Sequence, residues 1–320
     1  MPALQRAATL NYRTATADSA RWDAFEPREG DIVIATFAKC GTTWTQRIVD
    51  LLVHQDAEPR PVGDMSPWLD ARFFAPLEDD LATLAAQKHR RFIKSHLPFN
   101  ALPVYDGVKY IHVARDGRDA FMSWHNHVMG FRPEWIERLI AISEQDPALT
   151  PMPRMRPPED PHLFFQGWIA TAEAEPPEGP GRDMGFFDFE ATYWRERHRE
   201  NLLFVHYNDL KADLKGEMRR ISEFLEIDTP DDVLDELVAA AGFDAMKKHG
   251  AALVPVLASA FDKGAERFLN KGSNGRWRDA LTADDVARYQ AAADRKLSSS
   301  HLAWIERGRL LAGDPRAMAD

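Results

Sequence analysis

The chain has 320 residues, of which 44% are hydrophobic and 28% charged, values typical of a globular protein with a sizeable core. Its formal net charge of −10 excludes a broad basic surface, so neither nucleic acid nor an anionic membrane is an expected partner. Cys40 is the only cysteine, which excludes an internal disulfide and a cysteine-rich zinc site.

The N-terminal residues contain no continuous apolar segment, which argues against a secretory signal. No stretch of the sequence approaches the roughly 18 apolar residues of a membrane span. We therefore expect a cytoplasmic protein.

Strand and helix patterns alternate along the chain. Short apolar, β-branched runs predict strands at 31–37, 90–95, 108–115 and 201–207. Helical spacing of apolar residues predicts helices at 42–54, 117–129 and 210–227. This alternation predicts an α/β fold with a central, mainly parallel sheet flanked by helices.

Two stretches rich in proline and acidic residues, 145–161 and 172–185, flank a helical pattern around 162–172. They are typical of surface loops, so we expect an excursion or lid at about 145–185 that crosses the edge of the sheet. Since no internal repeat is visible, residues 1–320 are expected to form a single domain.

The segment "DIVIATFAKCGTTW" (31–44) joins a predicted strand directly to a predicted helix. Ligands of open parallel sheets bind beyond the carboxyl ends of the strands, and a helix N-terminus favours an anion there. Gly41 permits a positive φ, Lys39 supplies charge, and Thr42 and Thr43 can donate hydroxyl hydrogen bonds. The order differs from the Walker phosphate loop, in which the lysine follows the glycine. The segment therefore predicts an anion site of another kind.

Three segments together resemble the cytosolic sulfotransferases. "KCGTTW" resembles the 5′-phosphosulfate loop of that family, "VARDGRDAFMSWHNH" (113–127) its second signature, and "NKGSNGRWRDALT" (270–282) its third. They occur in the family's order, between about residue 31 and residue 282. The resemblance implies a P-loop-kinase-like sulfotransferase fold. It also implies the donor 3′-phosphoadenosine 5′-phosphosulfate (PAPS), with 3′,5′-diphosphoadenosine (PAP) as product and no metal.

The resemblance also implies which residues bind the donor. The 5′-phosphosulfate is expected at Lys39, Cys40, Gly41, Thr42 and Thr43, with Cys40 contributing its backbone. The adenine is expected at Trp44, Tyr207, Phe243 and Met246. The 3′-phosphate is expected at Arg115, Ser123, Asn270, Lys271 and Gly272. Asn270 stands where many members of the family carry arginine, and Ala241 and Gly242 replace a Thr-Ser pair, so three donor contacts are missing.

"KSHLP" (94–98) lies where the family carries its catalytic histidine, which implies that His96 is the general base. An imidazole with a pKa near 6.5 can accept the proton of an acceptor hydroxyl at neutral pH. Lys94 and Lys39 are expected to stabilise the charge of the transferring sulfuryl group. Trp68 and His127 fall near positions that line the acceptor pocket. A metal at His125 and His127 is not expected, because residues i and i+2 point apart on a helix.

Two alternatives stay open at this point. A nucleotide kinase or NTPase would share the phosphate-cradle architecture, and Asp116 and Asp119 offer carboxylates, but the first loop lacks the Walker order. A non-catalytic nucleotide-binding module is the other alternative. The acceptor is expected to be a small molecule with a hydroxyl or amine, whose identity the sequence does not reveal. "KKHGAALVPVLASAF" does not reproduce the family's dimer motif, so monomer and homodimer both remain open.

Overall fold

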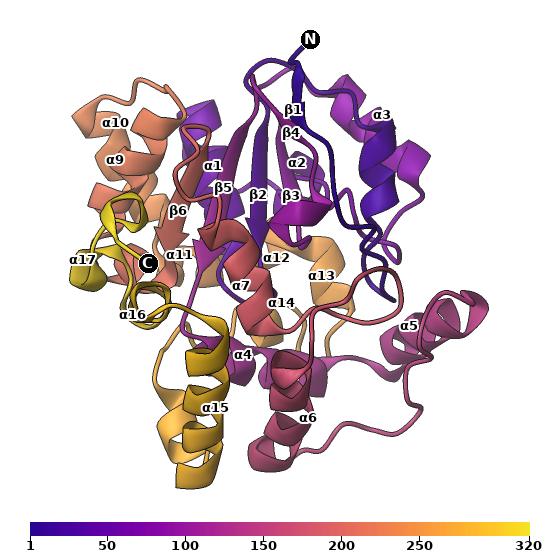
Figure 1. Ribbon diagram of the computed structural model, residues 1–320. Helices are drawn as coiled ribbons and strands as arrows, with labels where there is room; N and C mark the ends of the chain where they lie inside the picture. The colour runs from indigo at the N-terminus through magenta and orange to yellow at the C-terminus, as the bar shows by residue number, and fades with distance from the viewer.

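A four-stranded parallel sheet forms the centre of the protein. The computed structural model describes residues 1–320, apart from the side chain of Leu257. The strands are β2 (Ile32–Thr36), β3 (Phe92–Ser95), β5 (Lys109–Ala114) and β6 (Leu202–His206). They lie in the order β3-β2-β5-β6, and every pairing is parallel. Their carboxyl ends therefore meet at one edge of the sheet, toward α4 (Gly117–Gly130) in Figure 1.

The apolar run of β2 serves both faces of the sheet. Ile32 and Ile34 lie in a core shared with α1 (Thr42–His54), α9 (Leu214–Phe224) and α10 (Asp231–Ala241). Val33 and Ala35 lie in the core on the opposite face, which includes residues of α6 (Pro161–Glu173), α7 (Phe186–Trp194) and α15 (Ala283–Lys296). A strand covered on both faces needs apolar residues at every position, which explains its continuous hydrophobic pattern.

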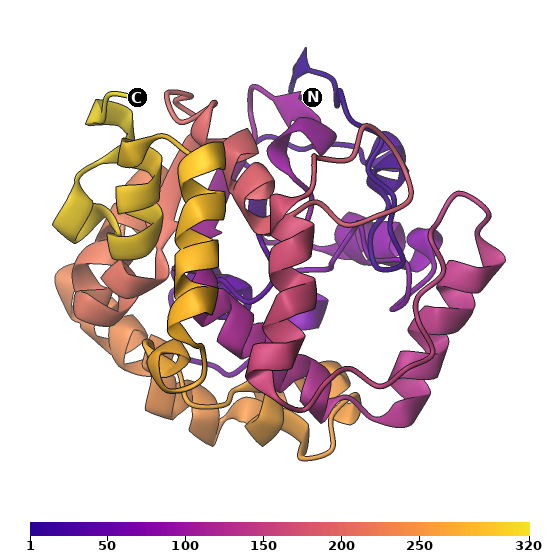
Figure 2. The same ribbon diagram turned by 60° about the horizontal axis from the view of Figure 1, so that its bottom comes forward.

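The region at 145–185 follows a projecting helix, α5 (Pro133–Gln145), and contains a packed helix, α6. α5 projects from the body of the molecule, at the right of Figure 1. α6 instead packs beside α15, as Figure 2 shows, and its Phe165 and Ile169 are fully buried. The proline-rich stretches 145–161 and 172–185 form the connections before and after α6.

All four predicted strands are confirmed, and α1 has the predicted bounds. The prediction of one helix over 210–227 is wrong. The structure has α8 (Tyr207–Ala212) and then α9, separated at Asp213, whose carboxylate accepts the Gly216 N–H at 2.9 Å and so caps a new helix. The sequence analysis also missed an antiparallel pair, β1 (Leu4–Arg6) and β4 (Val104–Tyr105).

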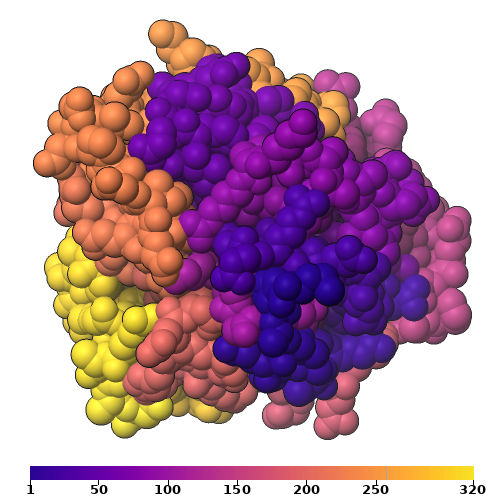
Figure 3. Space-filling view, turned by 90° about the horizontal axis from the view of Figure 1, so that it is seen from above, coloured from indigo at the N-terminus to yellow at the C-terminus, as the bar shows by residue number. Residues whose placement is uncertain are grey.

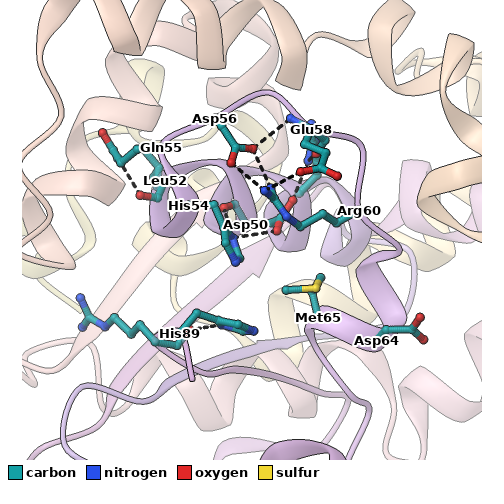
Figure 4. A network of polar contacts seen from close by, with 12 residues as sticks. Asp50, Leu52, His54, Gln55, Asp56, Glu58, Arg60, Asp64, Met65 and His89 are labelled. Carbon is teal, nitrogen blue, oxygen red and sulfur yellow. Dashed lines mark hydrogen bonds and ion pairs between the residues drawn. The ribbon is translucent and has the colours of Figure 1, made fainter. Parts of the chain in front are cut away.

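Polar contacts stabilise the C-terminal end of α1, opposite the end that begins after Gly41. Arg60 donates to both carboxylate oxygens of Asp56, at 2.7 and 2.6 Å, and His54 Nδ1 lies 3.1 Å from Asp50 Oδ1 (Figure 4). A helix of 13 residues is roughly 20 Å long, so this network supports the helix without taking part in the turn at its start.

The N-terminal residues cover the face at the amino ends of the strands. Figure 3 shows them in indigo, lying over the segment near residue 100, while the C-terminal residues lie apart from them. Among the described residues, no helix is both long enough and apolar enough to cross a bilayer.

The remaining helices are α2 (Val62–Met65), α3 (Leu77–Ala86), α11 (Phe243–Lys248), α12 (Gly250–Leu253), α13 (Pro255–Ser259), α14 (Gly264–Phe268), α16 (Ser299–Arg307) and α17 (Arg309–Ala312). Short 3₁₀ helices are η1 (Ser19–Ala24), η2 (Phe99–Ala101), η3 (Arg276–Asp279) and η4 (Pro315–Ala317).

Truncating a leucine on the buried face of α1 is expected to destabilise the whole fold. Leu51 is fully buried, so Leu51→Ala should lower the free energy of unfolding by about 2–5 kcal/mol through lost burial and a residual cavity. Leu163→Ala makes the same chemical change at a side chain that is 55% exposed, and should cost less than about 0.5 kcal/mol. Urea denaturation measures both, and equal losses would contradict the assigned role of α1.

Candidate active site

The turn between β2 and α1 has the backbone shape of an anion-binding loop. Lys39 (φ +71°) and Gly41 (φ +118°) both adopt left-handed conformations, and for a lysine this conformation is uncommon and strained. Gly41 is the N-cap of α1 and has no side chain that could accept a hydrogen bond from the first turn. The backbone N–H groups in the first turn of α1 are therefore free for a ligand. A Cβ at position 41 would lie 3.1 Å from Tyr207 Cδ2, so the turn also depends on a close approach that glycine allows.

Lys39 extends its amino group among cationic, imidazole and aromatic groups. Its Nζ lies 3.1 Å from Nδ1 of His127 and 4.7 Å from the centre of the Phe268 ring. Burial, together with the charges of Lys94 and Arg115, lowers the pKa of Lys39 to about 7. A buried amine among like charges is stabilised when an anion binds beside it.

A hydrogen bond to the backbone fixes the tautomer of His96. Its Nδ1 lies 2.7 Å from the carbonyl oxygen of Thr36, and because a carbonyl can only accept, Nδ1 carries the hydrogen. Nε2 therefore keeps its lone pair. Burial and the neighbouring Lys94 charge hold the pKa of His96 well below its usual 6.5. The imidazole is thus neutral near pH 7 and can accept a proton at Nε2.

Asp70 connects His96 to the aromatic side of the site. This buried carboxylate accepts the Nε1–H of Trp68 at 2.7 Å, the Nε1–H of Trp22 at 3.3 Å and the backbone N–H of His96 at 3.1 Å. The rings of Trp68 and His96 are perpendicular, with centres 4.8 Å apart. Sequence analysis missed Asp70, because nothing in the segment "SPWLD" indicates that these partners fold around it.

Lys94 lies on the same side of the site as His96. Its Nζ is 3.9 Å from the centre of the Trp68 ring, and burial lowers its pKa to about 8. The charges of Lys94 and Lys39 both lower the pKa of His96, so the predicted base and both predicted charge stabilisers lie within electrostatic reach of one another. The structure therefore brings the three predicted catalytic residues together.

A second cluster joins the three predicted donor-binding segments. The Arg115 guanidinium lies 4.1 Å from the centre of the Tyr207 ring and donates to the Lys39 carbonyl at 3.4 Å. It also donates to Oδ1 of Asn274 in the third segment at 2.7 Å. Trp44 and Tyr207 make an edge-to-face pair with ring centres 5.3 Å apart. Arg115 is thus the contact point between the β2–α1 turn and the third segment.

The other predicted adenine contacts surround these rings. Trp44 donates its Nε1–H to the Ala241 carbonyl at 2.8 Å. The Phe243 ring packs so closely on Gly272 that a Cβ there would lie 2.7 Å from it. Met246 lies in a small separate core against which Trp44 packs, so it supports the indole from behind.

The remaining predicted residues differ in burial. Thr42 is buried, and its hydroxyl lies 2.6 Å from that of Thr36, whereas Thr43, Ser123 and Asn270 are half-buried. The side chain of Lys271 is exposed, and the groups of the glycine turn that accept from Arg115 are the Ser273 carbonyl and the Asn274 side chain. Cys40 is fully buried, and burial raises the pKa of its thiol, which keeps it uncharged.

Aromatic side chains border the site beyond Trp68 and His127. Trp68 packs against Phe73 and Phe74, which both contact Trp135 of α5. His127 packs edge-to-face against Phe131 and Phe261, whose rings stack with centres 5.0 Å apart. These aromatic rings thus suit the apolar part of a ligand, beside the cationic groups of Lys39 and Lys94. Among the described residues, no cluster of His, Cys, Asp and Glu is arranged to hold a metal ion.

The chain is similar to known proteins along most of its length. The model of the sulfotransferase domain family matches residues 29–301. A glycolipid sulfotransferase of Mycobacterium bovis is 34% identical over 310 residues, which cover 93% of this chain and 94% of that protein. Sulfotransferase 1 family member D1 of Rattus norvegicus is 25% identical, covering 88% of each chain. The structure of retinol dehydratase with androsterone and inactive cofactor PAP superposes with a TM-score of 0.67 at 22% identity, covering 88% of this chain and 84% of that one.

Replacing the carboxylate of Asp70 is expected to loosen the site. The two carboxylate oxygens of Asp70 accept from the N–H groups of Trp22, Trp68 and His96. Asp70→Asn leaves one side-chain oxygen for these three donors, so at least one buried donor loses its partner. We expect the free energy of unfolding to fall by about 1–3 kcal/mol, measured by urea denaturation. Asp64→Asn, at an exposed carboxylate, is the matched control and should change it by less than about 0.5 kcal/mol. A loss at Asp70 no larger than the loss at Asp64 would contradict the assigned role.

Proposed function

The chain belongs to the sulfotransferase family, and from this premise we propose that it moves the sulfuryl group of PAPS to a hydroxyl group of a partly apolar small molecule. The observation that carries the proposal is the neutral His96, whose free Nε2 lies within electrostatic reach of Lys94 and Lys39 at the carboxyl ends of β2 and β3. The family membership favours this reaction over that of a nucleotide kinase.

The donor-binding residues fit a nucleotide with several negative charges. The buried Nε of Arg115 has no hydrogen-bond partner among the described residues, and the first-turn amides of α1 face the same turn as Lys39. The half-buried Trp44 would stack on the purine, and such stacking contributes on the order of 1–3 kcal/mol per base. Tyr207 is buried beneath the Arg115 guanidinium and packs edge-to-face against Trp44, so it would hold the indole and the arginine in place. When bound, the donor would supply an activated sulfuryl group. These residues would hold it without a metal, because lysine and arginine already provide the positive charge.

His96 would act on the acceptor. Its Nε2 accepts the hydroxyl proton as the oxygen attacks, while Nδ1 stays bonded to the Thr36 carbonyl and keeps the ring oriented. Lys94 and Lys39 stabilise the negative charge that develops on the transferring group and the leaving oxygen. Sulfuryl transfer resembles phosphoryl transfer in this respect, since positioning and charge stabilisation do most of the work.

The acceptor would place its apolar part among the aromatic residues. Trp68 packs edge-to-face against His96, and Phe74 and Trp135 belong to the same aromatic cluster, which supports an amphipathic acceptor such as a glycolipid. The 34% identity to a glycolipid sulfotransferase points to the same class. A cytoplasmic location and the choice between monomer and homodimer stay predictions from the sequence.

Removing the general base should separate binding from catalysis. We expect His96→Ala to bind PAP with wild-type affinity in calorimetry, because the imidazole is assigned to the acceptor side. Sulfate transfer to a panel of labelled hydroxyl acceptors should fall by about 10²–10⁴-fold, the usual contribution of a general base.

His198→Ala removes an exposed histidine and serves as the control, with both properties expected to stay at the wild-type level. Transfer by His96→Ala that stays within a few-fold of wild type would show that another group takes the proton. A wild-type protein that binds PAP and sulfates no acceptor in the panel would support the non-catalytic alternative.

Donor binding should also take up protons at pH 8. In the free protein Lys39, with a pKa of about 7, is mostly neutral at pH 8, and Lys94, with a pKa of about 8, is half neutral. A bound polyanion favours the charged form of both amines and raises both pKa values. We expect uptake of about one proton per PAP at pH 8, obtained from calorimetry in buffers of different ionisation enthalpy.

At pH 6 both amines are already charged, so uptake by the lysines should approach zero. Lys39→Arg keeps a permanent charge at this position and should remove more than half of the uptake at pH 8. Uptake that is the same in Lys39→Arg and wild type would show that Lys39 is not the titrating group.

A further inference from the structure

The third segment brings a further arginine to the donor site. Gly275, with φ +81°, is the N-cap of η3, and its N–H donates to Oδ1 of Asp119 in α4 at 2.7 Å. This contact fixes η3 against α4, and Arg276 is the first residue of η3. Arg276 is half-buried, and it follows directly on the Ser273–Asn274 pair that accepts from Arg115.

Arg115 and Arg276 each keep an N–H group that the protein does not satisfy. Arg115 is 5% exposed and uses its two Nη atoms on Lys39, Ser273 and Asn274, but its Nε finds no partner among the described residues. The Nε of Arg276 is buried and equally without a partner in the part of the chain that the structure describes. Buried donors are rarely left unpaired in folded proteins, because each carries a desolvation penalty.

The charge around the two guanidinium groups is also uncompensated. Burial and the charge of Arg115 lower the pKa of Arg276, which places the two cations within electrostatic reach of each other. Asp119 is the carboxylate that opposes this effect, and one of its oxygens is already engaged by the Gly275 N–H. Arg115 and Arg276 beside the single carboxylate of Asp119 leave a net positive charge, and the Nε–H group of each arginine lacks a hydrogen-bond partner among the described residues.

We propose that Arg276 binds the 3′-phosphate of the donor nucleotide together with Arg115. A phosphate satisfies both idle N–H groups and offsets the repulsion, and the planar guanidinium matches its geometry. This inference rests on the proposed function, and it assigns the second cation of the 3′-phosphate subsite to a residue outside the predicted set. Asn270 is uncharged and the side chain of Lys271 is exposed, so the half-buried Arg276 is better placed than either to supply positive charge in this segment.

The test compares two probes that differ only in the 3′-phosphate, namely PAP and adenosine 5′-monophosphate. We expect Arg276→Gln to weaken PAP binding about 10- to 100-fold in calorimetry and to change adenosine 5′-monophosphate binding less than about twofold. Arg278→Gln is the matched control, because Arg278 has the same charge, lies in the same short helix and is exposed against Trp277. Its affinity for both nucleotides should equal that of wild type.

The outcomes distinguish a failure of the proposed function from a failure of the role of Arg276. A wild-type protein that binds both probes equally would overturn the proposed function, whatever the variants do. If wild type prefers PAP and Arg276→Gln keeps the same preference, the role of Arg276 is wrong while the proposed function stands. The same conclusion follows if Arg276→Gln binds PAP and adenosine 5′-monophosphate more weakly by the same factor. Arg276→Lys retains the charge and carries the test if the Gln variant does not fold. We expect Arg276→Lys to lose less PAP affinity than Arg276→Gln, and no loss at all would contradict the role of the Arg276 guanidinium.

Discussion

The gathering of cations at the carboxyl edge of the sheet is the constraint on which the site depends. Lys39, Lys94 and Arg115 come from three segments of a chain whose net charge is −10, and the other two lower the pKa of Lys39. Desolvated like charges destabilise the free protein, and the left-handed backbone of Lys39 adds strain. The surrounding sheet and helices hold this arrangement, so a polyanionic nucleotide meets cationic side chains that are already positioned, and the two lysines gain charge as it binds.

Local signals explain why part of the site could be predicted from the sequence. The strand, glycine turn and helix from 31 to 54 are encoded in consecutive residues, and α1 has the predicted bounds. The break at Asp213 was missed because the apolar spacing continues across it, although its capping contact reaches only to Gly216. The family signatures supplied the order of the three binding segments, which periodicity alone does not contain.

The contacts that orient His96, the proposed base, join residues far apart in the sequence, so no local pattern predicts them. His96 bonds to the Thr36 carbonyl 60 residues away, and Asp70 joins side chains at 22 and 68 to the backbone of His96. These partners meet only because β2 and β3 pair in parallel, with Ala35 opposite Ser95. Strand register therefore sets the tautomer of His96. Arg276 was missed for a similar reason, since its place beside Arg115 depends on the contact between Gly275 and Asp119.

Asp70 shows how a carboxylate can sit near this cation cluster without neutralising it. Its oxygens accept from two indole N–H groups and one backbone N–H, and none of these donors is a lysine. The hydrogen bonds only partly offset the burial of the carboxylate, and burial leaves the pKa of Asp70 raised above its usual value. Burial likewise keeps the pKa of Lys94 lowered to about 8 despite the opposing charge of Asp70. Asp70 thus orients Trp68 and His96 and leaves the positive potential of Lys94 and Lys39 available to an anion. Because Asp70 makes no direct ion pair with Lys94 within the described residues, the proposed charge stabilisation and the orientation of the proposed base would be separate tasks of neighbouring groups.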